Sequence, residues 1–215
     1  MNTTVLQSDV RLDLIPDRPE LLPVRLVCGP QVVIGRNQHE CDLVSWLLPR
    51  NAENDRETLK LSQVHSYLFQ EGTKLRLRDA DSATGTFWNG QAVPLGQGIT
   101  APWGLEGRLS LGRNFHVSIA WLPSEHPRCA VLSPLVSEPA IRQCLWMVVA
   151  RCGFMIRPDE PSRWLHPAAH GETADVVVEI RSRELWWCPA DGKEVRIEDG
   201  ADLSAGKLRM KAALR

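Results

Sequence analysis

Ser62 and His65 lie three residues apart in the segment KLSQVHSYLF, at the start of an apolar, β-prone stretch. A serine beside a histidine can be a hydrolytic nucleophile, but that chemistry also needs an acid that orients the histidine and an oxyanion hole. No G-x-S-x-G elbow surrounds Ser62, and GRLSLG at 107–112 is one residue too long for that motif. We therefore expect Ser62 to bind a ligand, and we predict no catalytic residue and no enzymatic activity.

Arg36 is the second residue suited to binding chemistry. It follows Gly35 at the end of the β-type run VVIG, so a strand end would hold its guanidinium in place. A guanidinium forks onto two oxygens of a phosphate, and a serine hydroxyl adds a neutral donor. A fixed cation and a hydroxyl on neighbouring loops are what a phosphate group requires.

The elements that would carry these loops are short strands. From Leu21 to about Pro123, β-type runs alternate with turn residues, and the segment KLRLRD at 74–79 alternates leucine with charged residues at period two. This pattern predicts a mainly β protein with an N-terminal antiparallel β-sandwich. The charged segment 49–60 interrupts the strands, and we interpret it as a long loop that frames a site.

Three motifs in this order, IGR at 34–36, LSQVH at 61–65 and DADSATGTFWNG at 79–90, resemble those of the forkhead-associated (FHA) domain over about residues 21–123. The resemblance implies a module that binds phosphothreonine peptides. It assigns the phosphate contacts to Arg36 and Ser62.

The resemblance also gives roles to the neighbouring positions. Thr84 stands where FHA domains usually carry Asn, and a hydroxyl cannot both donate and accept as a carboxamide does. The affinity and specificity for peptide are therefore open at this position. The predicted peptide-binding residues are Arg36, Ser62, Gln63, Thr84 and Asn89, and the predicted structural supports are Gly35, His65, Gly85 and Thr86.

The rest of the chain is assigned by pattern alone. Residues 1–20 are polar and proline-punctuated, which indicates a loose leader, and residues 124–215 predict a smaller α+β unit of unassigned role. In that unit, apolar residues at helical spacing predict one helix between Ser137 and Cys152, followed by a β-meander. The adjacent Trp186 and Trp187 would point to opposite faces of a strand, and we interpret the outer one as part of a protein-docking face.

Composition narrows the class of protein further. With 25 Lys and Arg against 26 Asp and Glu, the net charge of −1 disfavours nucleic-acid binding. The six cysteines form no CxxC pair, so we expect reduced core residues, and we predict no metal and no cofactor. No signal peptide or membrane span is recognisable, and we expect a cytoplasmic protein.

These observations lead to two hypotheses. The first is a bacterial, non-enzymatic adaptor that captures a threonine-phosphorylated protein, with a Ser/Thr kinase acting upstream and with the C-terminal unit as a second contact. The alternative is a constitutive assembly subunit whose degenerate FHA fold binds an unphosphorylated protein. The adaptor requires the side chains of Arg36 and Ser62 on one exposed rim, whereas the assembly subunit does not.

Overall fold

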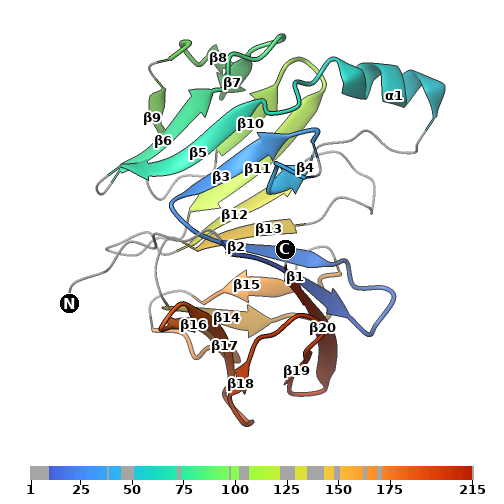
Figure 1. Cartoon of the computed structure of the whole chain (residues 1–215), viewed down its shortest axis with the longest axis vertical. Coiled ribbons are helices and arrows are strands. Elements are labelled where there is room, and N and C mark those ends of the chain that lie inside the picture. The colour runs from blue at the N-terminus through green and yellow to red at the C-terminus, as the bar shows by residue number, and fades with distance from the viewer. Residues whose placement is uncertain are drawn as a thin grey trace. The chain divides into compact units, whose positions relative to one another are not determined.

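The protein is mainly β, with a single helix among the residues that the structure describes (Figure 1). The computed structural model describes residues 10–37, 39–44, 51–71, 74–96, 98–101, 107–121, 129–134, 143–147, 151–161, 164–168 and 171–214. The fold divides into two compact units. The middle unit comprises Gln31–Trp121 and Val131–Cys144, and the terminal unit comprises Met1–Pro30, Leu122–Ala130 and Leu145–Arg215.

The first sheet of the middle unit has five strands in the order β4-β3-β5-β6-β9. Their bounds are β3 (Gln31–Gly35), β4 (Leu43–Val44), β5 (Ser66–Glu71), β6 (Lys74–Asp79) and β9 (Ile99–Ala101). All pairings are antiparallel except that of β3 with β4. Val32, Leu68 and Leu77 lie opposite one another across β3, β5 and β6, and all three are fully buried. Leu77 of the alternating segment 74–79 therefore faces the core.

The second sheet of the middle unit contains β11-β10-β7-β8. These strands are β7 (Thr86–Trp88), β8 (Gln91–Ala92), β10 (Gly107–Leu111) and β11 (Phe115–Trp121). Leu109 of β10 pairs with Val117 of β11, and both are buried. Two apolar faces of this kind make the antiparallel sandwich that the sequence predicts.

Helix α1 (Ala52–Leu59) occupies the charged segment that we predicted to be a loop. Asn51 caps it, because its side-chain oxygen accepts hydrogen bonds from the backbone N–H groups of Glu53 and Asn54. Figure 1 shows α1 next to the turn between β10 and β11. In the described part of the chain, no helix is long and apolar enough to cross a membrane.

The terminal unit includes residues that we predicted to be a leader. Its strands β1 (Val10–Pro16), β2 (Val24–Cys28), β19 (Asp202–Ala205) and β20 (Leu208–Leu214) run in the order β19-β20-β1-β2. The loose leader is thus wrong for residues 10–16, since β1 pairs with both β2 and β20. Its polarity has a structural reason: buried Asp13 accepts two hydrogen bonds from buried Arg25 (2.7 and 3.0 Å).

The other sheet of the terminal unit has the order β15-β14-β16-β17-β18. Its strands are β14 (Arg151–Ile156), β15 (Leu165–Pro167), β16 (Val176–Arg181), β17 (Glu184–Pro189) and β18 (Val195–Arg196). Two further strands, β12 (Cys129–Pro134) and β13 (Gln143–Met147), each contain residues of both units. The units therefore interleave in sequence and do not follow the boundary predicted at residue 123.

The helix predicted between Ser137 and Cys152 is wrong where the structure describes it. Residues 143–147 form β13 and residues 151–156 form β14. Cys144 to Met147 are all fully buried, so both faces of β13 are covered. A strand buried on both faces is a continuous apolar run, and periodicity cannot distinguish it from a buried helix. The unit is therefore all β over the described residues.

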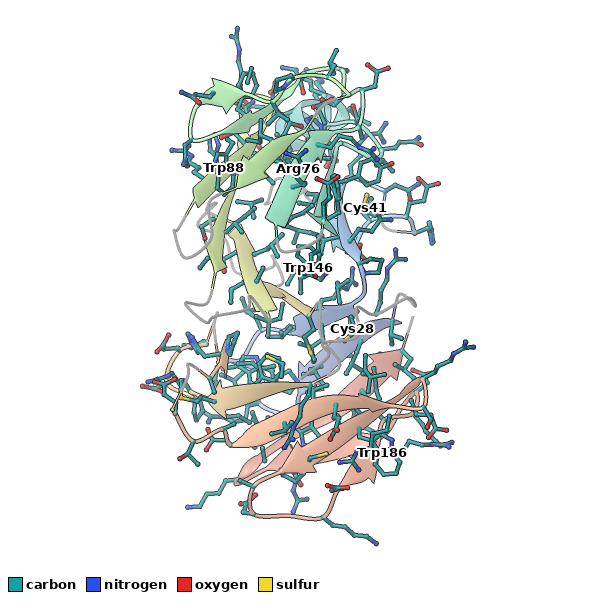
Figure 2. The ribbon with its side chains drawn as sticks, turned by 90° about the vertical axis from the view of Figure 1, so that its left-hand side faces the viewer. Cys28, Cys41, Arg76, Trp88, Trp146 and Trp186 are labelled. Carbon is teal, nitrogen blue, oxygen red and sulfur yellow. The ribbon has the colours of Figure 1, made fainter. Side chains whose placement is uncertain are left out.

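Buried tryptophans form much of the terminal core. Trp146, Trp164 and Trp187 are fully buried, and each indole N–H donates to a backbone carbonyl, at Gly29, Leu22 and Ser204 respectively (2.7–2.8 Å). Trp186, labelled in Figure 2, lies on the opposite face of β17 and is only partly buried, with the Arg181 guanidinium 5.3 Å from its ring centre. The two tryptophans thus face opposite sides as predicted, and the docking role of Trp186 stays a prediction.

Candidate functional site

Three loops of the middle unit meet beside the end of β3. The backbone N–H of Arg36 donates to the carbonyls of Ser62 (3.3 Å) and Gln63 (3.0 Å), which joins the loop after β3 to the loop before β5. The backbone N–H of Ala83 donates to Ser62 Oγ (3.0 Å), which joins the loop between β6 and β7. Arg36, Ser62 and the residues around Thr84 are therefore brought together as the sequence predicts.

Arg36 is partly buried and is held through one nitrogen of its guanidinium. Its Nε donates to the carbonyl of Leu61 (2.7 Å), and its terminal nitrogens have no partner among the described residues. A guanidinium fixed in this way keeps both terminal NH2 groups for a planar or tetrahedral anion. Gly35 makes this possible, because a Cβ at that position would lie 2.2 Å from the carbonyl oxygen of Gln63.

Ser62 presents a hydroxyl that is not used as a donor within the described structure. Its Oγ accepts from Ala83 and its hydrogen has no described partner. Gln63 is exposed and binds the neighbouring loop through its backbone, since its carbonyl accepts from the backbone N–H groups of Arg36 and Asn37 and from the thiol of Cys41. The carboxamide of Gln63 therefore lies on the surface of the same loop as the Ser62 hydroxyl.

His65 is fully buried beneath this loop. Its Nδ1 accepts from the backbone N–H of Ser62 (3.3 Å), so the proton is on Nε2, which donates to the carbonyl of Gly85 (3.0 Å). Burial lowers the pKa of the imidazole below its ordinary value of 6.5, although the Gly85 hydrogen bond and the charge of Asp79 oppose this. The neutral ring supports two loops, and its ring nitrogens are engaged by groups other than Ser62 Oγ.

Asp79 is a supporting residue that the sequence-based list of site residues omits. Its carboxylate accepts from the backbone N–H and the hydroxyl of Ser82 (both 2.7 Å) and from the hydroxyl of Thr86. Burial raises the pKa of Asp79, but the hydrogen bonds from Thr86 and Ser82 outweigh it and lower the pKa below its ordinary value. The sequence shows only that Asp79 ends a β-type run, and its supporting role depends on burial, which a single acidic residue does not reveal.

The Asp79 network fixes the glycine that precedes β7. Ser82 Oγ accepts from the backbone N–H of Gly85 (3.0 Å), and Gly85 has a φ of +78°, a conformation that suits glycine. Thr86 is buried and begins β7. Gly85 and Thr86 therefore support the loop as the sequence indicates.

Thr84 and Asn89 have different surroundings. Thr84 is exposed, and its hydroxyl makes only a long contact with the carbonyl of Lys60 (3.4 Å). Asn89 follows the far end of β7, where its side-chain oxygen accepts from the backbone N–H of Arg108 (2.8 Å). Because β7 runs between Gly85 and Asn89, the structure does not bring Asn89 to the three loops.

A cavity of about 420 Å³ adjoins the loops. Leu61, Thr84 and the turn between β10 and β11 contribute to its lining, together with the end of α1. In the part of the chain that the structure describes, no three His, Cys, Asp or Glu side chains cluster in a way that could hold a metal ion. The site therefore consists of cationic and hydroxyl donors beside a cavity.

One family model matches part of this chain. The model of the FHA domain family matches residues 32–100, which contain Arg36, Ser62 and Asp79. No curated protein matches the chain.

Two solved structures are similar at low identity. The FHA domain of the CT664 protein from Chlamydia trachomatis is 13% identical and has a TM-score of 0.31, with 47% of this chain and 89% of that chain covered. The FHA domain of a hypothetical protein from Arabidopsis thaliana is 15% identical and has a TM-score of 0.34, with 65% of this chain and 97% of that chain covered. On the family match, residues 32–100 of this chain belong to the FHA domain family, whose members are phosphopeptide-binding protein-interaction modules.

Proposed function

We propose that this protein is an adaptor that binds a threonine-phosphorylated protein segment at the Arg36–Ser62 rim. One observation carries the proposal. A backbone hydrogen bond joins the loop that carries Arg36 to the loop that carries Ser62. The terminal nitrogens of Arg36 have no partner among the described residues, and neither has the hydroxyl hydrogen of Ser62. A phosphate group satisfies both at once, with charge-assisted hydrogen bonds to the guanidinium.

The proposal includes no catalytic step. Ser62 lacks a base, because the nitrogens of His65 bond to the Ser62 amide and to Gly85. The proposed protein is therefore a non-enzymatic, cytoplasmic adaptor, which needs a Ser/Thr kinase upstream to make its ligand. The terminal unit supplies a second contact in this proposal.

The test is a titration with phosphothreonine peptide pools, alongside matched phosphoserine and unphosphorylated pools, followed by calorimetry. We expect saturable binding to the phosphothreonine pool alone. Arg36→Ala should weaken it by roughly ten- to hundred-fold, because a charge-assisted hydrogen bond contributes about 1.5–3 kcal/mol. Arg209→Ala removes one charge from an exposed position in the terminal unit and should leave binding unchanged.

Thr84 gives a reason to keep the second candidate, a constitutive assembly subunit that binds unmodified protein. A threonine here offers a single hydroxyl where FHA domains usually present a carboxamide, and that hydroxyl is exposed. Equal binding of all three peptide pools, insensitive to Arg36→Ala, would establish the assembly subunit and exclude the phosphate site.

A further inference from the structure

The cavity beside the rim has an apolar floor and a charged edge. Leu61, Leu111 and Phe115 contribute to its lining and are themselves buried residues. Its charged members come from two elements: Glu57 and Lys60 from the end of α1, and Arg113 from the turn between β10 and β11. The chemistry of the cavity therefore depends on which of these charges is already neutralised.

Glu57 is fully engaged. One carboxylate oxygen forms an ion pair with the ammonium group of Lys60, one helical turn away, and the other accepts from the Nδ2 of Asn114 (2.6 Å). The carboxylate thus ties α1 to the turn between β10 and β11 and cancels the charge of Lys60. Because the charges of Glu57 and Lys60 are paired with each other, neither side chain is expected to select a charged ligand.

Arg113 is the cation that remains. It is exposed on the same turn as Asn114, and its guanidinium has no partner among the described residues. With Glu57 and Lys60 paired, the charged side chains of the cavity sum to one positive charge, that of Arg113. A cavity lined by apolar side chains and by one arginine without a partner among the described residues suits a ligand group with a short carbon stem and a carboxylate end.

The cavity is connected to the phosphate-binding rim through shared residues. Leu61 accepts the hydrogen bond from Arg36 Nε and also lines the cavity, and Thr84 lines it next to Ala83, which bonds to Ser62 Oγ. A peptide anchored by its phosphate between Arg36 and Ser62 therefore has the cavity within a few residues of its anchor, because an extended chain advances about 3.3 Å per residue.

We propose that this cavity receives an acidic side chain of the bound phosphopeptide and that Arg113 selects it. The inference rests on the proposed phosphopeptide function and names its ligand more closely: a phosphothreonine segment with a glutamate or aspartate near the phosphate. Glu57 has a positioning role, because it holds α1 against the turn and neutralises Lys60.

The experiment uses one phosphothreonine peptide on the full chain and replaces each of its flanking positions in turn by Glu or by the neutral isostere Gln. Fluorescence anisotropy gives Kd for each pair. We expect one position at which the Glu peptide binds about three- to five-fold tighter than the Gln peptide, since an exposed ion pair contributes up to about 1 kcal/mol. Arg113→Gln should abolish that preference without weakening the Gln peptide, and Arg209→Gln should leave it intact.

Two outcomes overturn the inference and can be told apart. In the first outcome the phosphorylated peptide binds, Arg36→Ala abolishes this binding, and the Glu and Gln peptides of every pair have equal Kd. Arg113 then selects nothing, and the phosphopeptide function stands. If phosphorylated and unphosphorylated peptides bind alike, the proposed function fails and this inference fails with it. A Glu preference that persists in Arg113→Gln also overturns the assignment to Arg113.

Discussion

His65 connects the two loops through its neutral form. Nδ1 accepts from the Ser62 amide, and a second proton on the ring would turn this acceptor into a donor facing another donor. Protonation would therefore break the contact that positions Ser62. The buried ring and its lowered pKa follow from the same arrangement.

This gives a prediction for pH. Because the folded-state pKa of His65 lies below 6.5, its contribution to stability is complete above about pH 6.5 and is lost as the pH falls through the folded-state pKa. Histidine NMR titration should give His65 a pKa below 6.5 with the proton of the neutral ring on Nε2. As the pH is lowered through this range, the urea concentration at the midpoint of unfolding should decrease. The decrease should be smaller in His65→Gln, which lacks the titrating ring. A His65 pKa at or above 6.5 would contradict this account.

Thr84 allows a second test at the scale of one side chain. If its hydroxyl bonds to the peptide, Thr84→Val should weaken phosphopeptide binding by about two- to ten-fold, since a neutral hydrogen bond contributes about 0.5–1.5 kcal/mol. Thr84→Asn supplies a donor and an acceptor and should strengthen binding above that of the wild type. Calorimetry with the same peptide measures both changes. Wild-type affinity in both variants would exclude Thr84 from the contact.

The sequence predicted those residues of the candidate site whose type suits binding and whose position is next to a predicted strand. Arg36, Ser62 and Gly85 follow or precede strands and have side chains or backbone freedom that a loop site needs. Asn89 is placed elsewhere, because the same Asn-Gly pair that attracts attention is a hairpin turn at the opposite end of β7. Asp79 was missed because its function depends on burial, which a single acidic residue does not reveal.

At the scale of elements, α1 depends strongly on Asn51, the capping residue that precedes it. The helix has eight residues, only Thr58 of them is buried, and Asn51 accepts from two of its free N–H groups. An isolated helix of this length is marginal in water, so the cap and the Glu57 contacts with the β10–β11 turn stabilise it.

We therefore expect Asn51→Ala to destabilise α1 by about 1 kcal/mol, which is about a five-fold loss of hydrogen-exchange protection at the Asp55 amide. Asn51→Asp keeps an acceptor at the cap and should retain the protection. Since Glu57 of α1 lines the cavity, Asn51→Ala should also weaken any Glu preference of bound peptides. Equal exchange in both variants would show that the cap does not limit opening of the helix.

The strands of the middle unit were easier to predict than those of the terminal unit for a physical reason. Over residues 76–79 buried side chains alternate with more exposed ones, and the sequence alternates with them. Residues 144–147 are covered on both faces, so the alternation disappears and the apolar run fits a helix equally well. Helix α1 was missed for the opposite reason, because a polar helix has almost no apolar stripe.

At the scale of the molecule, pairing between distant segments was beyond the reach of local patterns. Residues 10–16 are polar and proline-flanked, but they form β1 because β2 and β20 pair with both of its edges and Arg25 neutralises Asp13. A domain boundary read from composition falls near residue 123, whereas the compact units are made of interleaved segments. The fold class was predictable, and the membership of its units was not.

The pairing of β1 with β20 also bears on how the chain is made. Leu12 lies opposite Leu214, so β1 leaves the ribosome long before the strand that pairs with it. The middle unit has all of its residues once Cys144 has been synthesised, and it can fold while the terminal unit still lacks all five strands β14 to β18 as well as β19 and β20. During that interval β1, with its apolar Leu12 and Leu14, has an unpaired edge where β20 will later lie, and such an edge can pair with another chain.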